Sequence, residues 1–572
     1  VVGSSPTRLT IVIVKLMKDY SDQLPKIIQL HKEGNFKASI PILRKILESD
    51  KNNTELLKIL SFTELKIGNI NESIKTITKA ISIKPDEAEY YLFRGFSHMN
   101  NEDFKLAIKD FEKSIDKDSN LKDAYFNAGV AYSKINDLKK SVDYYNKLLE
   151  LDPNDSRAYT NLAYIKNDMG EYDSALMEVN KSIRINNKDL NLYLLRGKIN
   201  IELKNFDDAI LDFDKVISEG KSLNQPNFYH EGLYNKSLLK LLLGNYKEGW
   251  NLYENRLLIE KHQKFEEFKQ NEIFGKIIKN KIPYLDKMDN LRDSDILIIC
   301  EQGIGEHVIF LPLILEAAKI AQSVTLLIDQ RLVPLCERSF EDIVFLPLGT
   351  KDMYNSEYKK ELSILEKKKF DYHISVASLS RFFRKNIEDF KKTPEKFLKV
   401  NNKIKNDIKK ELNINQNKKK IIGISWRSFK SPFLNKKDIN LKKLELIFKD
   451  LDIELVNLQY GNVDDEIDNF VKETNIPIRK INYDIKKDLD ALTSLIDLCD
   501  LVISTDSVTV KLSGAINKET WLLIPNVSTF FYQLNRKDCL WFPSIKLYRQ
   551  DKRDSWTNIL NNMRQDLIKR YN

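Results

Sequence analysis

The chain has 572 residues, which is long for one domain and predicts two to four compact units. Its 92 basic and 83 acidic residues leave a net charge of +9, too dilute for nucleic-acid binding without a local basic cluster. The cysteines, Cys300, Cys336, Cys499 and Cys539, stand far apart, so they predict no zinc site and favour a reducing compartment.

Near the start, the apolar stretch from Leu9 to Met17 is too short to span a bilayer and contains Lys15. The alternative is a degenerate signal segment, although no small-residue cleavage site follows it. We expect no transmembrane segment and a cytoplasmic location, with peripheral attachment to a membrane as a second option.

Residues 20–260 carry a repeat with a period of 34 residues. A large apolar anchor recurs six times at this interval and once more after 40 residues, at Phe36, Ile70, Phe104, Leu138, Tyr172, Phe206 and Tyr246. Three residues after each anchor comes a small residue, such as Ser39 or Ala107, which on a helix lets a neighbouring helix approach closely. A second register of small residues, among them Gly95 and Gly129, lies in the preceding helix. The six additional residues before the last unit, around 221–230, predict a longer loop.

Units such as residues 100–120 resemble tetratricopeptide repeats in their period and in their pattern of small and aromatic residues. The resemblance implies an α-helical solenoid of about seven units, whose groove binds a protein or peptide. An alternative is that the array is only a spacer or dimerisation arm.

From about residue 290 the pattern changes to short apolar runs separated by amphipathic segments. The runs are residues 295–300, 324–329, 343–347, 372–378, 420–426, 453–460, 500–505 and 520–525. Buried parallel strands have this pattern, and the helical segments between them predict a doubly wound α/β fold. We expect a linker at 261–289, one Rossmann-like lobe at 290–400, a polar inter-lobe linker at 401–419 and a second lobe at 420–572.

Ligands of such sheets bind beyond the carboxyl ends of the strands. Residues 504–507, Ser-Thr-Asp-Ser, close a predicted strand and open a helix, where backbone N–H groups and the helix dipole attract phosphate. Thr505 and Ser507 add hydroxyl donors, and Lys511 lies one turn further along. The alternative is that Ser504 and Asp506 only cap the helix.

Residues 504–525, STDSVTVKLSGAINKETWLLIP, resemble the nucleotide-sugar signature of glycosyltransferase family 9, the heptosyltransferase-like enzymes. Residues 302–310, QGIGEHVIF, resemble the first-lobe turn of that family, and the motifs GISWRS, LQYG and WFPSIKLYRQ resemble its repeat-containing members. The resemblance covers about residues 290–565 and implies a GT-B fold. In this fold the second lobe binds a nucleotide diphosphate sugar and the first lobe holds the acceptor.

The resemblance also implies roles for individual residues. Glu306 is the candidate catalytic base, and Gly303, Gly305 and His307 form the loop on the acceptor side. The donor-binding candidates are Trp426, Arg427, Lys437, Gln459, Tyr460, Thr505, Asp506, Ser507 and Lys511. Arg427 and Lys437 stabilise the departing diphosphate in place of a metal, so neither a metal nor a cofactor is expected.

Two residues depart from the family pattern, because Glu306 replaces the usual aspartate and Lys511 the usual histidine. As a base, Glu306 takes the proton of an acceptor hydroxyl. Its alternative role is that of a first-turn acid favoured by the helix dipole, and His307 is an alternative base. The Asp-x-Asp triplets lie in the repeats, at helix ends or just before strands, which are unsuitable positions for a metal site. A dinucleotide-binding fingerprint that starts at Gly303 would need a third glycine at the position of Val308.

The resemblance thus implies a glycosyltransferase whose repeats recruit an acceptor or partner. The acceptor is a glycan, a lipid-linked sugar or a protein. Repeats followed by a GT-B domain also resemble, in layout, the transferases that add O-linked N-acetylglucosamine to proteins. The rival hypothesis is a non-catalytic repeat scaffold with a degenerate GT-B domain.

Overall fold

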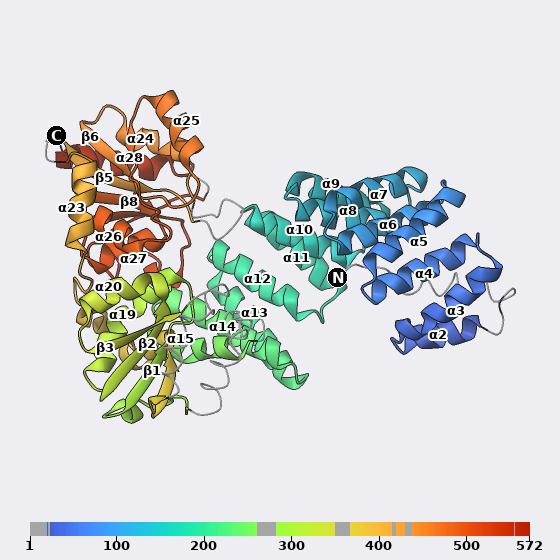
Figure 1. Ribbon diagram of the computed structural model, residues 1–572, viewed down its shortest axis with the longest axis horizontal. Coiled ribbons are helices and arrows are strands. Elements are labelled where there is room, and N and C mark those ends of the chain that lie inside the picture. The colour runs from blue at the N-terminus through green and yellow to red at the C-terminus, as the bar shows by residue number, and fades with distance from the viewer. Residues whose placement is uncertain are drawn as a thin grey trace. The chain divides into compact units, whose positions relative to one another are not determined.

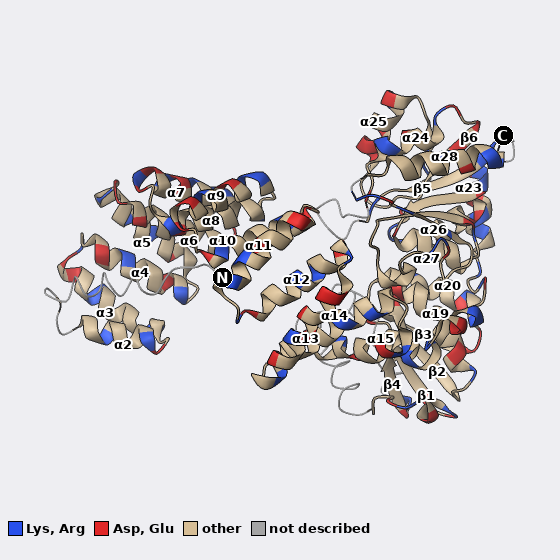
Figure 2. Cartoon of the chain, turned by 180° about the vertical axis from the view of Figure 1, so that it is seen from behind, with Lys and Arg blue, Asp and Glu red and all other residues tan. Residues whose placement is uncertain are grey.

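The structure is a computed structural model that describes residues 20, 23–259, 282–348, 367–414, 419–428, 438–553 and 555–571 (Figure 1). The chain divides into two compact units, Val1–Ile199 and Asn200–Asn572, and the division falls inside one helix, α12. The stretch Leu9–Met17 and the candidate donor residue Lys437 lie outside the described residues. In each unit basic and acidic residues are interspersed along the helices (Figure 2).

The first unit is built from helix pairs of repeat length. Its helices are α2 (Leu24–Lys32), α3 (Phe36–Ser49), α4 (Thr54–Lys66), α5 (Ile70–Ile83), α6 (Ala88–Asn100), α7 (Phe104–Lys117), α8 (Lys122–Lys134), α9 (Leu138–Leu151), α10 (Ser156–Asp168), α11 (Tyr172–Ile185) and α12 (Leu190–Leu203). The second unit opens with α13 (Phe206–Ser222), α14 (Pro226–Leu242) and α15 (Tyr246–Tyr253). Each of the seven anchor residues predicted from the sequence is the first residue of a helix, so the predicted helical repeat is confirmed.

The repeat period is also present in the backbone. The turn before each anchored helix contains one residue in the left-handed conformation, at Gly34, Gly68, Glu102, Asn136, Gly170, Lys204 and Gly244. Their φ angles lie between 61° and 82°. This conformation reverses the chain within a few residues and is easiest for glycine. A glutamate, an asparagine and a lysine adopt it here, because the helices on both sides fix the turn.

The two registers of small residues mark close helix contacts, as predicted. Ser39, Ser73 and Ala107 are fully buried. A Cβ added to Gly95 would lie 2.7 Å from Cδ1 of Phe111. Small residues therefore recur with the repeat period at positions where two helices are too close for a larger side chain.

The prediction of a longer loop before the last unit is wrong. The additional residues lengthen α13 and α14 to 17 residues each, compared with 14 in α11. Helix α13 continues through Gly220 to Ser222, and α14 begins with Pro226, since proline is favourable at the first position of a helix.

The rest of the second unit contains two parallel sheets. The strands of the first sheet are β1 (Asp295–Ile299), β2 (Ser323–Asp329), β3 (Ile343–Leu348) and β4 (Tyr372–Ser375), in the order β3-β2-β1-β4. Those of the second are β5 (Lys420–Ser425), β6 (Ile453–Asn457), β7 (Ile478–Arg479), β8 (Leu501–Thr505), β9 (Thr520–Ile524) and β10 (Ile545–Arg549), in the order β10-β9-β8-β5-β6-β7. The second order is that of a Rossmann-type sheet, with its switch point between β5 and β8. In the first sheet the switch point lies between β1 and β4.

The eight predicted strands are present, whereas β7 and β10 were not predicted. The helices of these parts are η1 (Glu254–Leu258), η2 (Met288–Leu291), α19 (Ile304–Ala318), η3 (Gln330–Leu332), α20 (Val333–Ser339), η6 (Val376–Leu379), α22 (Ser380–Phe383), η7 (Ile387–Lys392), α23 (Asn402–Glu411), η8 (Leu441–Leu444), α24 (Glu445–Phe448), α25 (Asp464–Thr474), α26 (Leu489–Leu498), α27 (Val508–Ala515), η9 (Phe530–Tyr532) and α28 (Thr557–Tyr571).

Apolar side chains of the central strands point alternately to the two faces of the second sheet, and both faces are buried. Ile422 and Ile424 belong to a core with residues of α24, α25 and α28, whereas Ile421 belongs to another core with residues of α23, α26 and α27. Figure 1 shows these two helix groups on opposite faces of the sheet. Neighbouring residues of a strand point to opposite faces, so a continuous apolar run requires a helical layer on each side.

The last repeat helix packs into the same core as the two sheets. The ring of Trp250 in α15 lies 6.3 Å from that of Phe310 in α19, and 5.6 Å from that of Phe530 in η9. This aromatic packing explains why the second compact unit begins at the end of the repeats rather than at the first strand. Helix α23, within the expected inter-lobe linker, packs on α26 through an ion pair of 2.6 Å between Lys405 and Asp497.

Within the described part of the chain, no helix has both the length and the apolar character needed to cross a membrane.

Gly514 in α27 provides a test of the packing around the second sheet. A Cβ added there would lie 2.6 Å from Cδ1 and 2.7 Å from Cβ of Phe542. Because the Cβ of Phe542 moves only with the backbone, we expect Gly514→Ala to lower the free energy of unfolding by about 1–3 kcal/mol. Denaturant unfolding of the full chain measures the change. The control is Gly305→Ala, whose added Cβ would meet Lys511 only at 3.8 Å and should not lower stability. Equal stability of both variants would contradict the packing described here.

Candidate functional site

The turn after β1 leads directly into α19. Gly303 precedes the helix with φ −70° and ψ 159°, an extended conformation that other residues adopt readily. Gly305 lies in the first turn of α19, beside Cε of Lys511 and Cα of Val508 in α27. The turn of the first sheet therefore lies close to a helix of the second, at a distance that leaves room for a Cβ at Gly305.

The same turn is attached to the end of the repeats by buried polar contacts. Nη2 of Arg256 in η1 lies 2.6 Å from Oε1 of Glu301 and 2.9 Å from Oγ of Ser378. Nε2 of Gln302 donates to the hydroxyl of Tyr253 at 2.7 Å. Burial alone lowers the pKa of Arg256, but the charges of Glu301 and Glu254 outweigh it and raise that pKa above its ordinary value. The guanidinium is thus a permanent charge in the core.

Beyond β8, three side chains form a compact hydrogen-bonded cluster. Nζ of Lys511 contacts Oδ1 of Asp506 and lies 2.9 Å from the hydroxyl of Tyr532. Tyr532 donates to the same Asp506 oxygen at 2.7 Å. Asp506 and Lys511 are 7% and 4% exposed, so the cluster is almost closed to solvent. We call these residues the Asp506–Lys511–Tyr532 cluster.

Glu306 lies close enough to this cluster to act on it electrostatically. Burial raises the pKa of Tyr532 well above its ordinary value, and electrostatic interactions with Cys539 and Glu306 raise it further. The tyrosine therefore remains protonated and can donate to Asp506. Glu306 also contributes to the raised pKa of Tyr234 in α14, which burial dominates.

His307 lies differently from its neighbour Glu306. It is 3% exposed, and its Nδ1 accepts from the backbone N–H of Asp329 at 3.4 Å, at the end of β2. The structure therefore directs this ring nitrogen toward the first sheet.

The candidates after β5 and β6 hold the ends of these strands together. Oε1 of Gln459 accepts from the backbone N–H groups of Trp426 and Arg427, both at 2.9 Å. Trp426 is fully buried and Gln459 is 1% exposed, so their side chains support the backbone of the strand ends. Nη2 of Arg427 lies 2.8 Å from Oε2 of Glu466. Tyr460, the residue after Gln459, is partly exposed.

The N-cap residue of α27 does not cap the helix with its own side chain. Ser507 occupies the N-cap position without a capping hydrogen bond, and Oγ of Ser504 instead donates to the carbonyl of Thr505 at 2.8 Å. Oγ1 of Thr505 is buried and has no hydrogen-bond partner among the described residues. The side chain of Asp506 instead contacts Lys511 and Tyr532. In the described ranges, no group of three or more His, Cys, Asp or Glu residues is arranged to hold a metal ion.

Two residues of the site were missed by sequence analysis. Tyr532 follows Lys511 by 21 residues and Arg256 precedes Glu301 by 45 residues, so neither spacing indicates contact. The only local signal for Arg256 is an arginine beside aromatic residues at the end of the last repeat.

The chain is similar to proteins with helical repeats. Residues 88–120 and 122–155 match a family model described as tetratricopeptide repeat, and residues 144–177 match a second model with that description. Protein FlbA of Caulobacter vibrioides is 25% identical over 332 residues, which cover 56% of this chain and 52% of that protein. The chain thus spans about half the length of this curated relative.

Among solved structures, a tetratricopeptide repeat protein from Parabacteroides merdae has 17% identity and a TM-score of 0.35, covering 44% of this chain and 97% of its own. The protein MamA has 25% identity and a TM-score of 0.27, covering 28% of this chain and 95% of its own. The family models and the helices described above establish that the chain contains tetratricopeptide repeats.

The Arg256–Glu301 ion pair is testable by a double-mutant cycle. Arg256→Met leaves the carboxylate of Glu301 buried without its partner, and we expect it to lower the free energy of unfolding by about 3–5 kcal/mol. The double variant Arg256→Met/Glu301→Leu removes both charges and should recover part of this loss. Denaturant unfolding of the full chain measures the cycle.

The exposed pair between Lys391 and Glu388 serves as the control for this cycle, since both side chains are more than two-thirds exposed. Lys391→Met should change the free energy of unfolding by less than about 1 kcal/mol. If the effects of Arg256→Met and of Glu301→Leu, each measured alone, add up to that of the double variant, Arg256 and Glu301 do not stabilise each other.

Proposed function

We propose that the chain is a glycosyltransferase with a GT-B arrangement, which transfers a sugar from a nucleotide diphosphate sugar to an acceptor hydroxyl. One observation carries the proposal: the switch-point turn of the first sheet, with Glu306, lies against the helix that follows the switch point of the second. Ligands of parallel sheets bind at such points. The resemblance of residues 290–565 to glycosyltransferase family 9 supports the same function.

On the donor side, the start of α27 offers backbone N–H groups to a diphosphate. The hydroxyl of Thr505 lies at the end of β8, and Arg427 lies at the end of β5, its neighbour in the sheet. A helix N-terminus attracts anions through its free N–H groups and its dipole. Arg427 and Lys437 then stabilise the negative charge of the departing diphosphate.

On the acceptor side, Glu306 is the proposed general base. Its carboxylate takes the proton from the acceptor hydroxyl while that oxygen forms a bond to the anomeric carbon of the sugar. The bond between this carbon and the diphosphate oxygen breaks in the same reaction, and the diphosphate leaves with the electron pair. Tyr532 stays protonated near this base, because burial and the charge of Glu306 both raise the pKa of the tyrosine.

The repeats provide a second binding surface in this proposal. Stacked tetratricopeptide helices commonly bind peptides or proteins, so the array recruits either the acceptor or a partner. A protein, a glycan and a lipid-linked sugar remain the acceptor classes. The proposed place of action is the cytoplasm.

A specific observation favours the rival hypothesis of a non-catalytic scaffold. Lys511 is 4% exposed and its ammonium contacts Asp506 and Tyr532, so it is already neutralised within the protein. Because these contacts already occupy the ammonium of Lys511, the site also fits a degenerate domain that no longer binds a donor.

The test is a transfer and hydrolysis assay of the full chain with a panel of nucleotide diphosphate sugars, paired with calorimetric measurement of donor binding. Glu306→Gln should lower turnover by roughly 10²- to 10⁴-fold with little change in donor affinity, because it removes only the base. Lys511→Met should weaken donor binding instead. The control is Glu341→Gln, whose side chain is 84% exposed and should leave both properties unchanged.

The results separate the two hypotheses. Donor binding with turnover that depends on Glu306 supports the transferase. Absence of binding and turnover across the panel would leave the scaffold as the function.

A further inference from the structure

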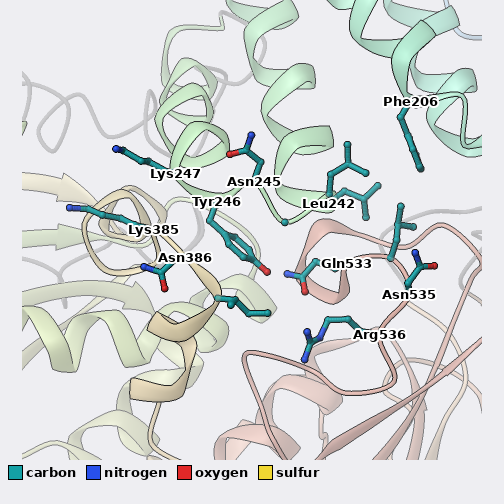
Figure 3. Close-up of a pocket in the computed structure, with 14 residues that line it drawn as sticks. Phe206, Leu242, Asn245, Tyr246, Lys247, Lys385, Asn386, Gln533, Asn535 and Arg536 are labelled. Carbon is teal, nitrogen blue, oxygen red and sulfur yellow. The ribbon is translucent and has the colours of Figure 1, made fainter.

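A cavity of about 580 Å³ lies where three segments of the second unit meet. They are the corner between α14 and α15 with the nearby Phe206, residues 385–387 at the start of η7, and residues 533–536 after η9 (Figure 3). Small-molecule binding sites commonly have volumes of roughly 300–1,000 Å³. The cavity is therefore large enough for a ligand of the size of a monosaccharide derivative.

The floor of the cavity is formed by buried polar side chains. Tyr246 and Gln533 are each 6% exposed, and Figure 3 shows the Tyr246 hydroxyl directed toward Gln533. Burial raises the pKa of Tyr246 to about 12, against the opposing effects of Arg536 and of a hydrogen bond with Gln533. The floor is thus neutral and able to form hydrogen bonds.

The backbone of Gln533 is held in an unusual conformation. Its φ and ψ angles are 43° and −176°, a region that residues with a side chain rarely adopt. The guanidinium of Arg549 donates to the carbonyl groups of Tyr532 and Gln533 and so fixes this peptide. The rigid backbone presents the Gln533 side chain to the cavity at a fixed position.

The rim carries three positively charged side chains. Lys247, Lys385 and Arg536 line the cavity, and none of the lining residues that the structure describes is acidic. Arg536 pairs with Asp538, whereas Lys247 and Lys385 have no ion-pair partner among the described residues. Both lysines extend to the same side in Figure 3, away from Phe206 and Asn535. An anionic group is therefore attracted to that end.

Amide side chains surround the remainder of the cavity. Asn386 uses its oxygen to accept from the backbone N–H groups of Glu388 and Asp389, so its amino group remains a possible donor. Asn245, whose Nδ2 donates to Glu248 at 2.9 Å, and Asn535 add further amides, and Phe206 supplies an apolar surface. Amides near an aromatic ring suit a ligand with several hydroxyl groups.

We propose that this cavity binds a small, hydroxyl-rich anion, namely a sugar that carries a phosphate or a carboxylate. The anionic group lies between Lys247 and Lys385, and the hydroxyl groups contact Gln533 and the asparagine side chains. The inference goes beyond the proposed sugar transfer and does not depend on it. Because Tyr532 and Gln533 are adjacent, a ligand here also contacts the segment that carries one residue of the Asp506–Lys511–Tyr532 cluster.

Calorimetric titration of the full chain with glucose 6-phosphate, glucuronate and glucose tests the proposal. We expect at least one of the two anions to bind and glucose to bind at least about tenfold more weakly, because it lacks the charge-assisted contacts. The difference between the two anions identifies phosphate or carboxylate as the preferred group. Lys247→Gln/Lys385→Gln should weaken binding of the preferred anion by about tenfold or more.

The matched control is Lys319→Gln/Lys410→Gln, which removes the same charge from two exposed lysines outside the cavity. It should bind the anion as the unchanged protein does. Equal weakening in both double variants, or equal affinity for glucose and the anions, would overturn the proposal.

Lysine acetylation provides a second measurement that does not require substitution. The bound anion should slow acetylation of Lys247 and Lys385 relative to Lys319, as mass spectrometry measures. Uniform rates in the presence of a binding anion would assign that anion to another site and overturn the proposal.

Discussion

The arrangement of the candidate site depends on one buried ion pair, between Arg256 at the end of the repeats and Glu301 at the end of β1. Both residues are 5% exposed, so neither charge can be satisfied by water. A buried charge without its partner is very unfavourable, and this makes the position of the turn after β1 inseparable from that of η1. Glu306 follows five residues later, and its position on α19 is set by the same contact.

Aromatic packing extends this constraint to the second sheet. The ring of Trp541 lies 5.5 Å from that of Phe310 and 5.0 Å from that of Phe390, and Trp250 of the last repeat helix contacts the same group. The loop that contains η9 is held between these rings and Arg549. Tyr532 therefore reaches Asp506 and Lys511 from a segment that the repeat helix supports. In this part of the chain the repeats contribute to the core as well as offering a surface.

Sequence periodicity predicted most of the fold because it records local geometry. The anchor at Phe104 is the first residue of α7, and the apolar run at 420–426 contains β5. Each pattern arises because one helix or strand packs against the elements next to it. The strand β7 was missed because two residues carry no periodic signal. The lengthened α13 was mistaken for a loop because an insertion has the same appearance in sequence, whether it extends a helix or a turn.

The candidate site was predictable only in the residues that follow strands. The proximity of Gly305 to Lys511 follows from two turns lying at the switch points of their sheets. Tyr532 and Arg256 reach the site from distant segments, and no motif connects them to it. Conversely, Trp426 and Gln459 follow strands as a ligand site requires, yet the structure buries both. Position after a strand does not reveal whether a side chain points to a ligand or supports the backbone.

The charges of the cluster limit how a donor can bind under the proposed function. Asp506 neutralises Lys511, Tyr532 is uncharged, and the nearby Glu306 adds a negative charge, so the side chains alone do not attract a diphosphate. The attraction must come from the start of α27 and from Arg427, which in this structure pairs with Glu466. Donor binding then requires that the phosphates compete with Glu466 for the guanidinium, and with Asp506 for the ammonium of Lys511. If they do, the ligand replaces two internal ion pairs with contacts of its own, and the closed cluster is the resting form of the site.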